Sequence, residues 1–281
     1  MQSSRRTMHA PNNSRSSARP PYFFLPTFSL WKREIVRFYR QRNRIIGALL
    51  SPLVFWFVIG SGIGPSFRMG SASRGINYLE YFFPGTLILI MLFTAIFSTI
   101  SIIEDRREGF LQSVLVAPIS SGSIVCSKVL GGTTLALLQG LIFLLLAPFI
   151  GIHITLLRLA ICLGTLFIVG LGLTGLGFLV AWPMESTQGF HAIMNVFLIP
   201  LWMLSGALFP VTNPHSWIYW AVQVNPVTYG VAAVRRALYA SDPGVSHLPA
   251  YSISIGFSLL FALATYIAAS VLVQRRPKGA A

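Results

Sequence analysis

Five consecutive charged residues separate two long apolar runs, and no other group of side chains in the sequence is better suited to a specific interaction. They are Glu104, Asp105, Arg106, Arg107 and Glu108. Four apolar residues then share one helical face: Phe110, Leu111, Val114 and Leu115. The sequence predicts an amphipathic helix at residues 104–117, ended by Pro118.

Two interpretations of this segment are open. It is either an interfacial helix that contacts only lipid, or a contact site for a soluble partner. We favour the partner because of the flanking sequence described below.

The sequence contains no recognisable catalytic, cofactor or metal motif. There is no G-x-x-x-x-G-K-[ST] loop, so the chain cannot bind ATP by that route, and no His-Glu-x-x-His. The five histidines are scattered, and Cys126 and Cys162 imply neither a disulfide framework nor a metal site. We therefore predict a protein that is not an enzyme.

The composition is that of an integral membrane protein, with 54% hydrophobic and 10% charged residues. The net charge of +14 does not indicate nucleic-acid binding, because the basic residues lie at the ends of apolar runs. We predict an all-α polytopic protein with six transmembrane helices. They lie near residues 45–62, 82–103, 128–150, 159–182, 190–209 and 251–273.

The distribution of lysine and arginine predicts that both termini are cytoplasmic. With six spans, ten basic residues precede the first span, three lie in 104–128 and three in the C-terminal tail, while only five face the other side. Lys128 lies at a span end, where its stem can reach the interface. The spans hold no Asp, Glu or Arg, which disfavours ion-coupled transport. If the protein pumps a substrate, its energy must come from outside this chain.

Residues 1–26 are rich in Ser, Arg and Pro and predict a disordered basic cytoplasmic tail, with a transit peptide as a minor alternative. The six-span membrane domain would then span residues 27–276. Within it, Trp31, Ile35 and Phe38 form a stripe beside basic residues, which predicts an N-terminal interfacial helix at 28–44.

Residues 210–250 predict an external segment, with a short re-entrant or interfacial helix between Pro214 and Pro226 and an amphipathic helix at 227–240. Its aromatic side chains are expected at headgroup level. They are Trp217, Tyr219, Trp220 and Tyr229.

The chain resembles the membrane permeases of type-two ATP-binding cassette (ABC) exporters, most closely those of drug resistance and nodulation-factor export. The resemblance rests on Tyr81-Phe-Phe-Pro-Gly85, on Glu108-Gly-Phe-Leu-Gln-Ser-Val-Leu-Val-Ala-Pro-Ile-Ser120 with Lys128 and Leu130, and on four later segments. These are Phe190-His191, Pro200, Leu204-Ser-Gly-Ala-Leu-Phe-Pro210 and Asn225-Pro-Val-Thr-Tyr229. Together they cover most of residues 28–275.

The resemblance implies an inner- or plasma-membrane permease, paired as a homodimer or with a related permease, and bound to two cassette ATPase subunits that carry the ATP and Mg. It also implies that the helix at 104–117 is the ATPase-coupling element, with a second inner-loop contact near Glu185. The expected substrate is an amphiphilic drug-like compound or lipid. The alternatives are a polysaccharide or glycolipid export permease, or an ATP-independent channel or scaffold.

Overall fold

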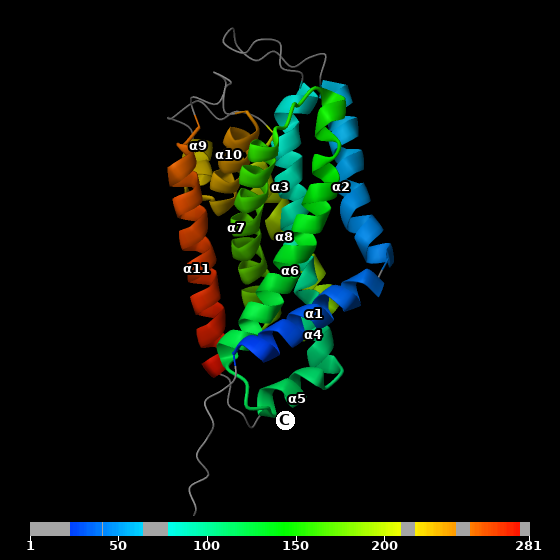
Figure 1. Cartoon of the computed structure of the whole chain (residues 1–281), viewed down its shortest axis with the longest axis vertical. Helices are drawn as coiled ribbons and strands as arrows, with labels where there is room; N and C mark the ends of the chain where they lie inside the picture. The colour runs from blue at the N-terminus through cyan, green and yellow to red at the C-terminus, as the bar shows by residue number, and fades with distance from the viewer. Residues whose placement is uncertain (1–22, 41, 64–77, 209–216, 240–247, 276–281) are drawn as a thin grey trace, which may run out of the picture.

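The computed structural model describes residues 23–40, 42–63, 78–208, 217–239 and 248–275, and the elements of this part of the chain are all helices (Figure 1). This confirms the predicted all-α class. Most of the tail predicted at residues 1–26 lies outside the described residues. The helices are α1 (Phe24–Arg40), α2 (Arg42–Ile63), α3 (Tyr78–Ser98), α4 (Ile100–Arg107), α5 (Phe110–Val116), α6 (Ser121–Leu144), the 3₁₀ helix η2 (Ala147–Ile150), α7 (Leu156–Ala181), α8 (Thr187–Met203), α9 (Trp217–Val224), α10 (Pro226–Leu238) and α11 (Tyr251–Arg275).

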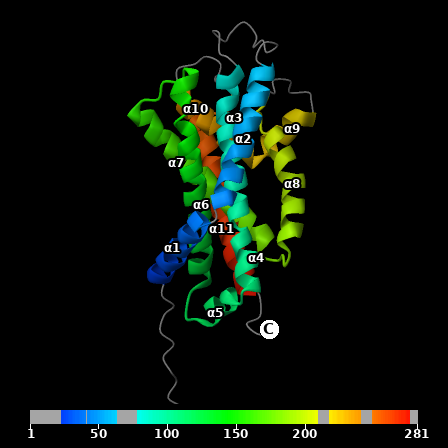
Figure 2. The same cartoon turned by 90° about the vertical axis from the view of Figure 1, so that its right-hand side faces the viewer.

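Helix α3 lies at the centre of the bundle, in contact with α2, α6, α7, α8 and α10. In the most apolar stretch of α3 and α4, 89% of the residues are buried, whereas in α11 the share is 17%. Helix α11 packs on α7 and presents its other side outward (Figure 1). Figure 2 shows α8 at one side of the bundle and α1 and α7 at the other. An apolar helix exposed in this way requires a lipid or protein neighbour.

Each of the six predicted spans contains a helix, but only four qualify as membrane-spanning by length and hydropathy. These are residues Tyr78–Arg107, Ser121–Leu144, Leu156–Ala181 and Tyr251–Arg275. The apolar part of α2, Leu49–Gly62, is shorter, and α8 has 17 residues, which is about 25 Å of helix. Among the described residues, the structure thus identifies four candidate spans, the shorter apolar part of α2 and the 17-residue helix α8.

The prediction of one continuous helix at 104–117 is wrong. Residues 104–107 are the last turn of α4, which continues the line of α3, and the chain then turns at Gly109. Gly109 has φ of 74°, in the left-handed region that glycine adopts without steric cost. Helix α5 therefore starts in a new direction. Likewise, the predicted helix at 28–44 ends at Arg40, and α2 begins at Arg42.

Short side chains let α3, α6 and α7 approach closely at the middle of the bundle. A Cβ added at Gly132 of α6 would lie 2.2 Å from Ser98 Oγ and 2.5 Å from Thr174 Cγ2. The Thr133 and Thr174 hydroxyls lie 3.3 Å apart at the same crossing. Glycine at this position is what allows the three helices to meet.

We expect Gly132→Ala to destabilise the bundle by about 1–3 kcal/mol, because the added methyl group overlaps the buried Thr174 and the half-buried Ser98 side chains. The measurement is the thermal midpoint of the detergent-purified protein. The matched control is Gly164→Ala in α7, where nothing lies within 4 Å of the new Cβ. Equal midpoints for the two variants would show that the crossing is not tightly packed.

Candidate coupling site

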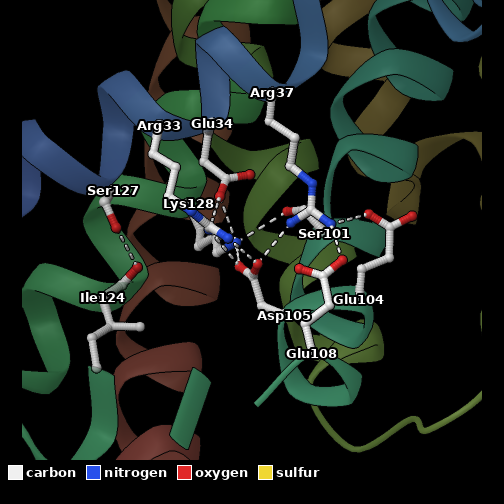
Figure 3. Close-up of polar contacts among 10 residues, drawn as sticks. All are labelled: Arg33, Glu34, Arg37, Ser101, Glu104, Asp105, Glu108, Ile124, Ser127 and Lys128. Atoms are coloured by element: carbon white, nitrogen blue, oxygen red, sulfur yellow. Dashed lines mark hydrogen bonds and ion pairs between the residues drawn. The ribbon is translucent and has the colours of Figure 1, made fainter. Parts of the chain in front are cut away.

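The centre of the site is the carboxylate of Asp105, which is fully buried on α4. Arg33 donates from Nη1 to Oδ2 at 3.1 Å and from Nη2 to Oδ1 at 2.8 Å. Arg37 donates to Oδ1 at 2.7 Å, and Lys128 Nζ donates to Oδ2 at 2.5 Å (Figure 3). One carboxylate thus receives four charge-assisted hydrogen bonds from two other helices, α1 and α6.

Lys128 is buried, with 8% of its surface exposed. Besides Asp105, its Nζ contacts Glu34 Oε1 at 2.7 Å and Ser101 Oγ at 3.1 Å. The expectation that Lys128 extends its stem to the interface is therefore wrong. Its ammonium group points into the junction of α1, α4 and α6, because two buried carboxylates there replace the water it would otherwise seek.

The more exposed edge of this cluster is formed by Arg37 and two further glutamates. Arg37 Nη2 lies 2.8 Å from Glu104 Oε2 and 3.3 Å from Glu108 Oε1. The charged cluster, as we call it, has three cations and four carboxylates: Arg33, Arg37, Lys128, Glu34, Glu104, Asp105 and Glu108. Removing one of its three most buried members, Glu34, Asp105 or Lys128, leaves an uncompensated buried charge, which costs about 3–5 kcal/mol.

Arg33 also joins the cluster to α5. Its guanidinium carbon lies 3.6 Å from the centre of the Phe110 ring. Burial alone would lower the pKa of Arg33, but the hydrogen bond and attraction to Asp105 raise it. The guanidinium is therefore a permanent positive charge between α1, α4 and α5.

Arg106 and Arg107 hold the short connection between α7 and α8. Arg106 Nη1 donates to the carbonyl of Met184 at 2.7 Å and Nη2 to that of Trp182. Arg107 Nε donates to the carbonyl of Glu185 at 3.0 Å. These bonds hold the loop of the predicted second ATPase contact beside α4 and α5, and the Glu185 side chain is exposed.

The structure changes the expected docking face of α5. Leu111 and Val114 are buried, at 4% and 8% exposure, and Leu111 belongs to the main core. Leu115 and Val116 are exposed, at 37% and 83%. The proposal of one free apolar face through Phe110, Leu111, Val114 and Leu115 is wrong for Leu111 and Val114, because the turn at Gly109 directs them into the bundle.

The predicted external aromatic residues fall into two groups. Trp217 and Trp220 on α9 are exposed, at 71% and 67%, with Tyr219 half-buried beside Trp220. Tyr229 stacks on Phe257 with ring centres 4.0 Å apart, and its hydroxyl donates to the Gln223 carbonyl. Tyr229 therefore joins α10 to α11.

An apolar cavity of about 500 Å³ opens between α1, α2, α3 and α8. Its wall is mostly aromatic and aliphatic, with a few polar groups. The lining includes Phe38, Ser51, Phe55, Phe93, Thr94, Phe97, His191 and Trp202. Such a composition suits a ligand that is largely apolar and has few polar groups.

Sequence reasoning missed four members of the charged cluster: Arg33, Glu34, Arg37 and Lys128. It placed the two arginines on an interfacial helix and the lysine at a span end. A signal for Glu34 was present, since it is the first acidic residue of the chain and the next is Glu80. A single acid in a strongly basic segment indicates a specific pairing.

The long apolar helices of the described chain, the apolar cavity and the charged junction at one end of the bundle define a multi-pass membrane permease. The chain belongs to the ABC-2 type transporter family, whose profile matches residues 26–239. This confirms the family assignment and the role as a permease of an ABC exporter. Membership implies an ATPase partner, and the related proteins are transport permeases rather than enzymes.

Relatives of known name agree with this assignment. The chain is 29% identical over 257 residues to the putative transport permease ycf38 of Cyanophora paradoxa, covering 89% of this chain and 88% of that protein. It is 22% identical over 251 residues to nodulation protein J of Rhizobium meliloti (strain 1021), covering 88% and 92%. It is 26% identical over 174 residues to the probable multidrug ABC transporter permease YbhR of Escherichia coli (strain K12), covering 59% and 45%.

We expect Lys128→Met to lower the free energy of unfolding by about 3–5 kcal/mol, because it leaves Asp105 and Glu34 without their shared buried cation. The double variant Lys128→Met/Asp105→Asn should lose less than the sum of the single changes, since the two groups interact directly. The thermal midpoints of the wild type, Lys128→Met, Asp105→Asn and the double variant give the interaction energy between Lys128 and Asp105. Lys32→Met, on the exposed side of α1, is the control; equal losses for Lys32→Met and Lys128→Met would contradict a structural role for the cluster.

Proposed function

We propose that this chain is the permease subunit that exports an amphiphilic drug-like compound or lipid from the cytoplasm or the inner leaflet, driven by ATP hydrolysis in a separate cassette ATPase. The observation that carries the proposal is the buried carboxylate of Asp105, which ties α1, α4 and α6 to the base of α5. A partner that moves α5 would move these elements together.

The proposed topology has six spans, counting α2 and α8 with the four candidates, and places both termini in the cytoplasm of a cell inner or plasma membrane. The charge distribution supports this orientation, because the basic residues before α2 and the charged cluster would then lie on the cytoplasmic side. Helices α9 and α10 lie at the opposite end of the bundle from α5 (Figures 1 and 2), and would face outward.

The proposed partners are two copies of the ATPase, which carry ATP and Mg, and a second permease, either identical or related. Helix α8 supports the pairing of permeases. Its exposed surface includes Val196, Phe197 and Ile199, and it forms one wall of the open apolar cavity. A second permease on this side would complete that wall.

We assign the ATPase contact to the exposed side of α5 rather than to the face expected from the sequence. Gln112, Leu115 and Val116 are exposed there. The base of α5 is held by Phe110 under Arg33 and by the buried Leu111 and Val114. A rigid element with different contacts in two ATPase states is what coupling requires.

The cavity provides the proposed substrate site. Phe55, Phe93 and Trp202 offer apolar surface, while Ser51 offers an isolated polar group. The Thr94 hydroxyl also lies in the wall, but it already donates to Gln139. An amphiphile matches this pattern. A polysaccharide would need many more hydrogen-bonding groups than the wall offers.

We expect Leu115→Glu/Val116→Glu to abolish ATPase capture and export while changing stability by no more than about 0.5 kcal/mol, because both residues are exposed. The measurements are pull-down of the ATPase by the permease, export in membrane vesicles and the thermal midpoint. Leu111→Glu is the contrasting variant: its side chain is buried, so the midpoint itself should fall. Wild-type capture and export by the double variant would place the ATPase contact elsewhere.

We expect Ser51→Trp to reduce export of a fluorescent amphiphile by about tenfold, equivalent to about 1.4 kcal/mol of lost binding, because the indole would fill the cavity. ATPase capture should be unchanged. Val54→Trp, one turn further along α2 and exposed outside the cavity lining, is the control. Full export by Ser51→Trp would show that the substrate passes by another route.

A further inference from the structure

A small cavity lined by both polar and apolar side chains lies at the end of the bundle opposite α5. It has a volume of about 100 Å³ and is enclosed by the turn that follows α8, by α9 and α10, and by residues 248–249. A space of this size exceeds what one water molecule needs. It is too small for a drug-like compound, so it is separate from the apolar cavity.

The wall of this cavity contains Arg235, which is 5% exposed. Its Nη1 and Nη2 donate to the hydroxyl and the carbonyl of Tyr81 at 3.4 and 3.3 Å, and its guanidinium carbon lies 4.2 Å from the centre of that ring. Its Nε has no hydrogen-bond partner. These acceptors are uncharged and distant, so they compensate a buried positive charge only weakly.

Arg235 forms no ion pair with any carboxylate of the described residues, in contrast to the cations of the charged cluster. The nearest acidic residue in sequence to Tyr81 is Glu80. Its Oε1 lies 3.4 Å from the position that a Cβ would take on Gly151, and its carbonyl accepts from Tyr239. Glu80 therefore does not supply the missing negative charge.

Two further donors line the same cavity, the Tyr219 hydroxyl and the Gln223 amide. Within the described part of the chain, neither side chain donates a hydrogen bond to another group. Ser205 and Thr228, by contrast, donate to the carbonyls of Trp202 and Val222 and have no proton left for a ligand. The cavity thus combines one buried cation with two uncommitted neutral donors.

A second arginine fixes the wall of this cavity. Arg236 donates from Nε to the Pro249 carbonyl at 2.7 Å and from Nη2 to the Leu248 carbonyl at 2.5 Å. The segment 248–249 is thereby attached to α10. Its position does not depend on a ligand, so the cavity is preformed.

We propose that this cavity binds an oxyanion, a carboxylate or phosphate group, on Arg235 with Tyr219 and Gln223 as additional donors. The planar guanidinium matches the geometry of such groups, and the anion supplies the charge that the buried cation lacks. The group comes either from a lipid headgroup or from a free solute. Bound there, it joins α9, α10 and the turn after α8 at one point.

The first experiment is the thermal midpoint of the full chain in detergent, with sodium phosphate or sodium acetate replacing sodium chloride at constant ionic strength. We expect a rise of about 2–4 °C for the wild type and none for Arg235→Gln. Arg275→Gln, which removes an exposed arginine at the end of α11, is the control and should respond like the wild type.

Because Arg235→Gln removes a buried side chain, a second variant keeps Arg235. Gln223→Glu places a carboxylate in the cavity and should raise the midpoint without added anion while abolishing the response to phosphate. A lower midpoint for Gln223→Glu would contradict the proposal.

The source of the anion is decided by native mass spectrometry with phosphatidylglycerol and with a phosphate-free neutral glycolipid. Preferential retention of phosphatidylglycerol, lost in Arg235→Gln and Gln223→Glu, assigns the site to a lipid headgroup. A midpoint shift with free phosphate alone assigns it to a solute. The proposal would be overturned if the wild type showed no midpoint shift with phosphate or acetate and no preferential retention of phosphatidylglycerol.

Discussion

The structure depends on the burial of one carboxylate, Asp105, at the meeting point of three helices. A buried ion must be matched closely, because the low-dielectric interior makes both its attraction to a partner and the cost of losing that partner large. Arg33 and Arg37 from α1 and Lys128 from α6 provide the match. The angle and depth at which α1 crosses the bundle are therefore set by charge as well as by apolar packing.

Buried cations are compensated differently at the two ends of the bundle. At the end near α5, the cations and carboxylates of the charged cluster are nearly balanced, and Arg106 and Arg107 add hydrogen bonds to the loop between α7 and α8. At the other end, Arg235 is buried without a carboxylate among the described residues. The first arrangement favours a junction whose parts move together, whereas the second favours an exchangeable ligand.

The helices were predictable from the sequence because apolar runs of sufficient length form helices, and local signals mark where they begin. Ser120, Thr155, Ser186 and Asn225 cap α6, α7, α8 and α10. The charged cluster was not predictable, because Arg33 and Asp105 are 72 residues apart. The prediction of which face of α5 is exposed was wrong for a local reason. A helical projection assumes one continuous axis, and the left-handed turn at Gly109 ends that axis.

The charged cluster and the apolar cavity share structural elements, which connects the two parts of the proposed mechanism. Phe38 lines the cavity one turn after Glu34 on α1, and Ser98 lines it one turn before Ser101 on the line of α3 and α4. A displacement of α1 relative to α4 therefore changes the cavity wall directly. Close-packed helices resist gradual deformation, so such a displacement would pass between discrete arrangements. The ion pairs at the base of α5 are then the contacts through which a partner's movement reaches the substrate site.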